Sequence, residues 1–250
     1  MTLIVDEVML REPNLLVPGK KPVGPVKIDW SHPITDRLVA AYIFRANEPA
    51  AVDLVTGAVT PFDPSMGASP EGVDMTSVSN VTDLPAPSEI AGSSQFTFVT
   101  RARSTDGAAI QGKVLFSYRN DTSTAGLFQV MPWDSYTGDG IRIYFDGGNR
   151  LNQDAGATHF NTNVHDISTI GFITDDVTAY IDNDPPLESG LNTERFLTAT
   201  PTAMSIGGRM GTTNLINSSY LHHLYVYSRV LTEPQIRDLH ADPYQFLIPA

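Results

Sequence analysis

The sequence contains no cysteine, so it has no means of forming a disulfide framework or a thiolate metal site. Basic residues are few: 16 of them stand against 28 acidic residues, which gives a net charge of -12. Binding to nucleic acid or to an anionic membrane needs basic patches, so we expect neither partner. The sequence also lacks a basic leader and a long apolar run, so we expect no signal peptide, no transmembrane helix and synthesis in the cytoplasm.

Motifs of catalysis are also missing. Glycosidases built on β-sandwiches can carry Glu-x-Asp-x-Glu on one strand, where alternate side chains share a face and flank one bond. No such triplet occurs, and Glu71, Glu89, Glu188 and Glu194 have no acidic residue two positions away. The sequence has no G-x-S-x-G, H-E-x-x-H or phosphate-loop motif. We therefore expect no catalytic residue and predict that the chain is not an enzyme.

The sequence does contain many short β-type runs separated by turn residues. Residues 38–44, 95–103, 141–145 and 177–183 are rich in β-branched and aromatic residues, and about ten such runs predict a β-sandwich. One helix is expected near the end, because Thr232 and Gln235 form a capping-box pattern and Pro243 stops the helix. Ile236 and Leu239 supply its narrow apolar stripe.

Residues 1–29 differ in composition from the rest of the chain. Pro13, Pro18, Pro22 and Pro25 argue against a regular helix or a central strand. The segment also carries three of the chain's four lysines. We therefore predict two parts: an extended, proline-rich N-terminal arm over residues 1–29 and a β-sandwich domain over residues 30–250. The arm is expected to dock on another subunit; the alternatives are that its own domain holds it, or that it is a flexible tail.

Candidate metal ligands are aspartates and histidines. In a regular strand His222 and His223 point to opposite faces, so they cannot chelate one metal and are interpreted as structural. Calcium prefers carboxylate oxygens, and the candidates are Asp53, Asp175, Asp176, Asp182 and Asp184. The last four flank a strand of about 17 Å, too long for one ion, so a role in turns is favoured for all five. We therefore predict no metal site, no cofactor-binding residue and no cofactor.

Three aromatic residues, Trp133, Tyr136 and Tyr144, offer rings that would stack on sugars if they are exposed. The alternative is that they belong to the core or to an interface, as aromatic residues more often do.

Four segments in order carry a family resemblance. Residues 95–103, 177–183 (VTAYIDN), 204–208 (MSIGG) and 220–239 resemble strands and the closing helix of laminin-G-like domains. Trp30-Ser31-His32-Pro33 and the final 242–247 stretch are similar to laminin-G-like proteins of tailed bacteriophages. The resemblance implies an all-β, concanavalin A-like jelly-roll β-sandwich with an extended arm and one short C-terminal helix.

The same resemblance implies a structural role on a phage virion. We predict a capsid decoration protein, located in the virion and attached through its arm and its sandwich surface. The expected partners are the major capsid protein or other virion subunits, further copies of the chain in a homo-oligomer, and surface glycans. The alternatives are a glycan-binding adhesion module, calcium-dependent or not, and a hydrolase.

Overall fold

The computed structural model describes residues 16, 18–46, 48–76, 79–91, 93, 95–104, 115–119, 128–135, 138–145, 149–152, 164–171, 177–182, 187–188, 203–208 and 219–250. Their contacts define two compact units. The terminal unit comprises Met1–Arg37 with Thr232–Ala250, and the sandwich unit comprises Leu38–Leu231. Each unit is described by itself.

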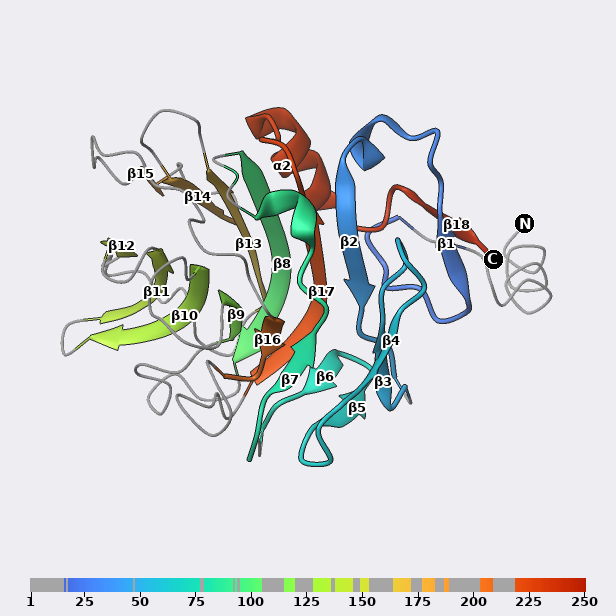
Figure 1. The fold of residues 1–250 in the computed structure, drawn as a ribbon, viewed down its shortest axis with the longest axis horizontal. Coiled ribbons are helices and arrows are strands. Elements are labelled where there is room, and N and C mark those ends of the chain that lie inside the picture. The colour runs from blue at the N-terminus through green and yellow to red at the C-terminus, as the bar shows by residue number, and fades with distance from the viewer. Residues whose placement is uncertain are drawn as a thin grey trace, which may run out of the picture. The chain divides into compact units, whose positions relative to one another are not determined.

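The sandwich unit is built from two large antiparallel sheets (Figure 1). The strands of the smaller sheet are β7 (Thr82–Leu84), β9 (Phe116–Arg119), β10 (Phe128–Ser135), β11 (Gly138–Phe145), β12 (Asn149–Asn152) and β16 (Ala203–Ile206). Those of the larger sheet are β2 (Leu38–Ile43), β5 (Gly67–Ser69), β6 (Gly72–Asp74), β8 (Phe96–Ser104), β13 (Val164–Gly171), β14 (Val177–Ile181), β15 (Leu187–Glu188) and β17 (Ser219–Tyr227).

The six-stranded sheet has the order β12-β11-β10-β9-β16-β7. The eight-stranded sheet has the order β15-β14-β13-β8-β17-β6-β5, and β2 also pairs with β17. A separate hairpin joins β3 (Ala50–Val52) to β4 (Val59–Pro61), and a short 3-10 helix, η2 (Ser88–Ile90), follows β7. The alternating runs of the sequence thus form strands, as predicted.

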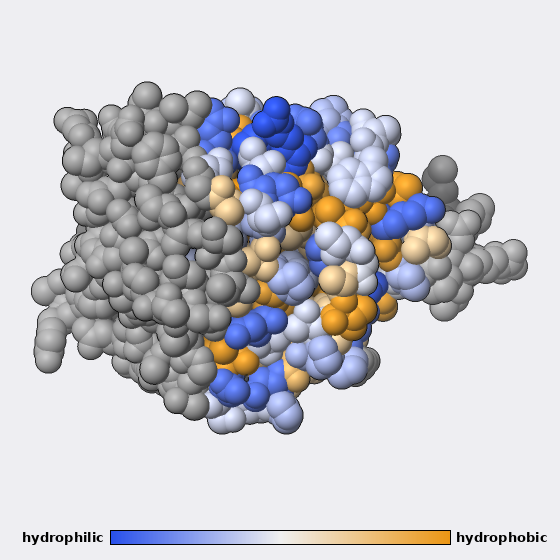
Figure 2. Space-filling model, in the orientation of Figure 1, coloured by the Kyte–Doolittle hydropathy of each residue, from blue (hydrophilic) through white to orange (hydrophobic). Residues whose placement is uncertain are grey.

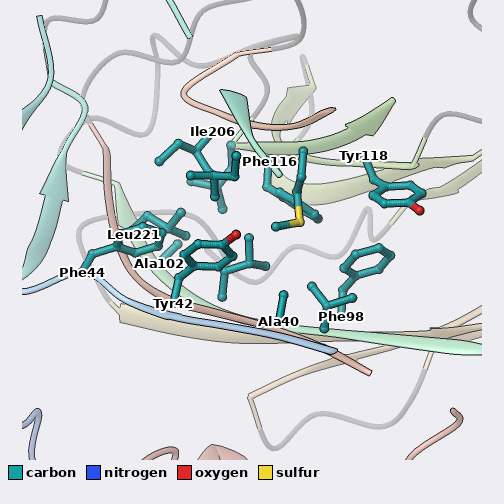
Figure 3. Packing of buried hydrophobic residues seen from close by; sticks show 14 of the residues in the cluster. Ala40, Tyr42, Phe44, Phe98, Ala102, Phe116, Tyr118, Ile206 and Leu221 are labelled. Carbon is teal, nitrogen blue, oxygen red and sulfur yellow. The ribbon is translucent and has the colours of Figure 1, made fainter. Parts of the chain in front are cut away.

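The two sheets share one hydrophobic core (Figure 3). The ring of Phe98, on the larger sheet, lies 5.2 Å from the ring of Phe116 and 5.8 Å from that of Tyr118, both on the smaller sheet. All three side chains are buried, and such tilted aromatic pairs add to the free energy gained from burial. The unit is therefore a β-sandwich, which confirms the all-β prediction; its jelly-roll winding stays a prediction.

The terminal unit contains the predicted helix, α2 (Glu233–Ala241). The side-chain oxygen of Gln235 accepts a hydrogen bond from the backbone N–H of Thr232 at 3.0 Å, as a capping box requires. Ile236 and Leu239 are both fully buried. In the described part of the chain, no helix is both long and apolar enough to cross a membrane.

Part of the predicted arm pairs with the chain's own C-terminal end. Strand β1 (Val26–Ile28) runs antiparallel to β18 (Leu247–Pro249) and is followed by a 3-10 helix, η1 (Pro33–Thr35). The N–H of Asp29 donates to the carbonyl of Phe246 at 2.9 Å, which extends this ribbon by one residue pair. Residues 26–28 therefore have an intrachain partner, while docking of the arm on another subunit stays a prediction.

Candidate functional site

A continuous row of residues crosses the outward face of the six-stranded sheet. Directly opposite residues of antiparallel strands share a face. Neighbouring positions, such as Phe116 and Tyr118 on β9 or Met204 and Ile206 on β16, belong to the core, so the row lies on the face turned away from the core. The register defines its members: Asp83, Ser205, Ser117, Gln129, Tyr144 and Arg150.

A second row on the same face brings another arginine close to the first. Arg142 stands opposite Met131 and Asn152. Arg142 and Arg150 are therefore diagonal neighbours on adjacent strands, a relation that separates residues by about 7–8 Å. We call Gln129, Arg142, Tyr144, Arg150 and Asn152 the arginine face.

The arginine face combines three kinds of residue that suit an acidic sugar. Guanidinium groups match a carboxylate with two parallel hydrogen bonds. Tyrosine offers an amphipathic ring with a polar tip, and the amides of Asn and Gln both donate and accept hydrogen bonds to hydroxyl groups. Two arginine positions on one face are notable in a chain of net charge -12.

The other end of the first row is already occupied by protein groups. The hydroxyl of Ser205 donates a hydrogen bond to the Asp83 carboxylate. The hydroxyl of Ser117 donates to the carbonyl of Gly208 at 3.4 Å, and both serines are fully buried. A ligand would therefore use strands β10–β12 rather than β16 and β9.

Two of the three aromatic candidates lie on this face of the sheet. Trp133 stands opposite Gly140. It lies an even number of positions from Gln129 on β10, so the two positions belong to the same face of the sheet. Tyr144 is part of the arginine face, while Tyr136 lies outside the described residues. Sequence reasoning missed the arginines. The signal was the alternation of Arg142 with Ile141 and Ile143, but the diagonal position of Arg150 on the next strand is not visible in the sequence.

A different charged cluster lies on the outward face of the larger sheet. Arg103 Nη1 and Glu71 Oε1 form an ion pair at 2.6 Å. The Arg103 guanidinium carbon lies 5.8 Å from the ring centroid of Tyr220, which stands opposite both Arg103 and Asp74. Burial and the nearby Asp74 carboxylate raise the pKa of Tyr220. The positive charge of Arg103 is balanced by Glu71 within the cluster. We therefore interpret the cluster as one that anchors the β5–β6 hairpin.

Asp53 accepts hydrogen bonds within a turn, while the absence of a metal there stays a prediction. One carboxylate oxygen accepts from the N–H groups of Ala41 and Val55 at 3.0 and 3.1 Å, and the other accepts from the Thr56 hydroxyl at 2.7 Å. The Asp53 side chain is buried. Burial of the Tyr42 hydroxyl, and secondly the charge of Asp53, raise the pKa of Tyr42. These bonds use the oxygens that a calcium ion would need.

Of the remaining candidate calcium ligands, only Asp182 lies among the described residues. Asp182 follows β14 with a φ of 49°. Asp175, Asp176 and Asp184 lie outside the described residues. No group of three or more His, Cys, Asp or Glu residues suited to a metal occurs among the residues that the structure describes.

His222 and His223 occupy an irregular part of β17. The register shifts between Leu221 and His223, so the regular alternation assumed for these two histidines does not hold at this point. His223 is fully buried and stacks on Tyr225 with ring centroids 4.5 Å apart. This environment is that of a packed, structural histidine.

No protein-family model and no curated protein matches the sequence. Solved structures do resemble it. One is the Trypanosoma rangeli sialidase in complex with sialic acid, with a TM-score of 0.65 and 15% identity over 98% of this chain and 39% of that chain. Another is the Ruminococcus gnavus IT-sialidase CBM40 bound to alpha2,3 sialyllactose, with a TM-score of 0.51 and 14% identity.

These likenesses cover very different shares of the two kinds of protein. The chain spans only 33% of the length of the Trypanosoma rangeli sialidase bound to the inhibitor DANA. It covers 94% of the CBM40 chain, with 66% of its own length. At such low identities the likeness shows the fold alone.

The comparisons correct one prediction. The expectation that the chain is not an enzyme is contradicted, because the solved structures that it resembles include several sialidases. The expectation rested on the missing Glu-x-Asp-x-Glu, but sialidases use a tyrosine nucleophile and need no such triplet. The absent motif therefore did not exclude glycosidases of this type. These structures lend no support to a phage origin or to capsid decoration, which stay predictions.

Proposed function

We propose that this protein is a glycan-binding β-sandwich that recognises a negatively charged sugar on its arginine face. The observation that carries the proposal is the register that sets Arg142, Tyr144 and Arg150 side by side on the outward face of the six-stranded sheet. The concanavalin A-like jelly-roll is the form of sandwich that we propose for it. This proposed function corresponds to the glycan-binding adhesion module that the sequence analysis gave as an alternative. Sugar binding of this kind requires no calcium.

Physical chemistry favours an anionic ligand over a neutral one. The chain as a whole repels anions, with 28 acidic residues against 16 basic ones. Two neighbouring arginines offset that repulsion locally and can hold a carboxylate with charge-assisted hydrogen bonds. A neutral sugar would gain the stacking and the hydroxyl contacts but not the charge-assisted hydrogen bonds that a carboxylate forms with guanidinium groups.

The comparisons support this class of ligand. The similar structures include complexes with sialic acid and with alpha2,3 sialyllactose, and sialic acid carries a carboxylate. The chain also covers nearly the whole of the CBM40 but a minor part of each sialidase. Sugar recognition is common to both groups of proteins, so it is the property that we carry over as a proposal.

Titration calorimetry with 3'-sialyllactose and with lactose tests the proposal. We expect the unmodified chain to bind 3'-sialyllactose more tightly than lactose, with an affinity that falls as salt rises. Arg142→Gln and Arg150→Gln should each weaken 3'-sialyllactose binding by about tenfold, because each removes a charge-assisted hydrogen bond. The matched control is Arg37→Gln, because Arg37 is exposed and lies in the terminal unit.

Equal binding of the two sugars, or equal effects of Arg37→Gln and Arg142→Gln, would contradict the proposal. Free sialic acid should be measured in the same incubations. Its release would extend the function from binding to hydrolysis, as the sialidase likeness allows. The predicted virion location, capsid partner and homo-oligomer remain separate proposals that this experiment does not address.

A further inference from the structure

Among the residues that the structure describes, the ribbon of the terminal unit has one strand edge whose backbone hydrogen-bonding groups have no partner. The N–H of Asp29 bonds to Phe246, and the N–H of Ala250 bonds to Pro25. Hydrogen-bonded pairs alternate along an antiparallel ladder, so Lys27 bonds to Ile248 in the same ribbon. The N–H and C=O groups of Val26 and Ile28 therefore point to the opposite edge of β1. Among the described strands β1 pairs only with β18.

The other edge of the ribbon is closed to an added strand. Of the two outward positions on β18, Pro249 has no N–H group. The N–H of Leu247 already donates to the carbonyl of Tyr244 at 3.0 Å. Strand addition to this ribbon would therefore take place at β1.

Exposed apolar side chains concentrate in the same unit. Four large hydrophobic side chains are exposed among the described residues, and three of them are Val23 (93%), Trp30 (57%) and Ile248 (37%). Val23 and Trp30 flank β1 in sequence, and Ile248 stands opposite Lys27. Figure 2 shows hydrophobic surface next to hydrophilic surface in the region of β1 and β18. Exposed apolar surface beside an open strand edge is typical of a binding surface.

Charge decides which partner suits this edge. Lys27 is exposed at the middle of β1. If β1 of a second copy paired antiparallel with it, Val26 would face Ile28 and the two Lys27 residues would face each other. Like charges directly opposite are destabilising, and a lysine on an edge strand discourages self-pairing. An acidic residue in that place would be stabilising.

We propose that the free edge of β1 binds an extended segment of another protein, which adds a third, antiparallel strand with an acidic residue opposite Lys27. The backbone groups of Val26 and Ile28 supply the main-chain hydrogen bonds, as in other cases of strand addition. On this edge Lys27 occupies a non-hydrogen-bonded position, where facing side chains approach most closely. The site is independent of the arginine face.

The test uses the full chain labelled with nitrogen-15 and two blocked peptides, Thr-Val-Glu-Val-Thr and Thr-Val-Lys-Val-Thr. Binding of the acidic peptide should shift the amide signals of Val26 and Ile28 and slow their hydrogen exchange. We expect the acidic peptide to bind about two- to fivefold more tightly than the basic one. Lys27→Glu should reverse that preference, and because the side chain is exposed the fold should be unchanged.

Lys20→Glu is the matched control, because Lys20 is also exposed in the terminal unit but lies outside β1. It should keep the preference for the acidic peptide. The proposal is overturned if neither peptide affects the two amides at millimolar concentration, or if Lys27→Glu leaves the preference unchanged. Protection of the same amides by self-association without peptide would assign the edge to a second copy and would also overturn it.

Discussion

Gly72 is the residue whose replacement should most directly test the packing of β6 against β17. Its φ of 146° is one that side-chain-bearing residues rarely adopt. A Cβ at this position would lie 2.0 Å from the carbonyl oxygen of Leu221 and 2.7 Å from its carbonyl carbon. Both atoms are backbone, so no side-chain rotation relieves the clash. Gly72→Ala therefore has to move β6 away from β17.

The cost follows from two terms. Holding alanine at an unfavourable φ costs about 1–3 kcal/mol. Forcing the extra methyl carbon into the tight contact between β6 and β17 costs about 1–3 kcal/mol more. We therefore expect Gly72→Ala to lower the free energy of unfolding by about 2–6 kcal/mol, a large part of the ~5–15 kcal/mol typical of a folded protein. Displacing β6 should also weaken the ion pair between Glu71 and Arg103.

Gly57→Ala is the matched control. Gly57 also has a positive φ, of 76°, but nothing lies within 4 Å of its Cβ position. Gly57→Ala should therefore cost only the energy of holding alanine in a left-handed conformation, about 1–2 kcal/mol. Urea denaturation midpoints, with unchanged slopes, would measure both variants. If the two alanine variants lose the same stability, the close approach of β6 and β17 is wrong.

Three further predictions follow from single residues. Leu239→Ala in α2 should lower the free energy of unfolding by about 2–5 kcal/mol, measured by the urea midpoint, because the side chain is fully buried. Ser65→Ala should raise the pKa of Asp63, measured by NMR titration, because it removes the hydroxyl hydrogen bond that, together with the bond from the Ser65 N–H, holds that pKa below its ordinary value. With the serine present, the Asp63 carboxylate stabilises the fold at pH values above its ordinary pKa. This stabilisation is lost as pH falls through the lowered pKa of the folded state. An Asp63 titration that Ser65→Ala leaves unchanged would refute this. Millimolar calcium or EDTA should leave the melting temperature unchanged, because the Asp53 oxygens already accept hydrogen bonds, and a calcium-dependent rise would refute that.

Local signals in the sequence predicted most of the strands and the helix. The strand predicted over residues 95–103 is β8, and the helix that follows Thr232 ends at Ala241, two residues before Pro243. Such features depend on alternation, caps and proline, which act over a few residues. The same kind of reasoning failed at His222 and His223, because a bulge is set by the partner strand and interrupts the alternation.

The sequence by itself thus determined the class of this protein: an acidic, cysteine-free chain whose alternating strands must bury one face against another. Only the tertiary structure decided what lies beside what. It set Arg150 next to Arg142 through the β11–β12 register, and it paired Val26–Ile28 with Leu247–Pro249 from the far end of the chain. The physical reason is that strand pairing is non-local. Each strand carries its own pattern of faces, but its neighbour and register are selected by the packing of the whole core.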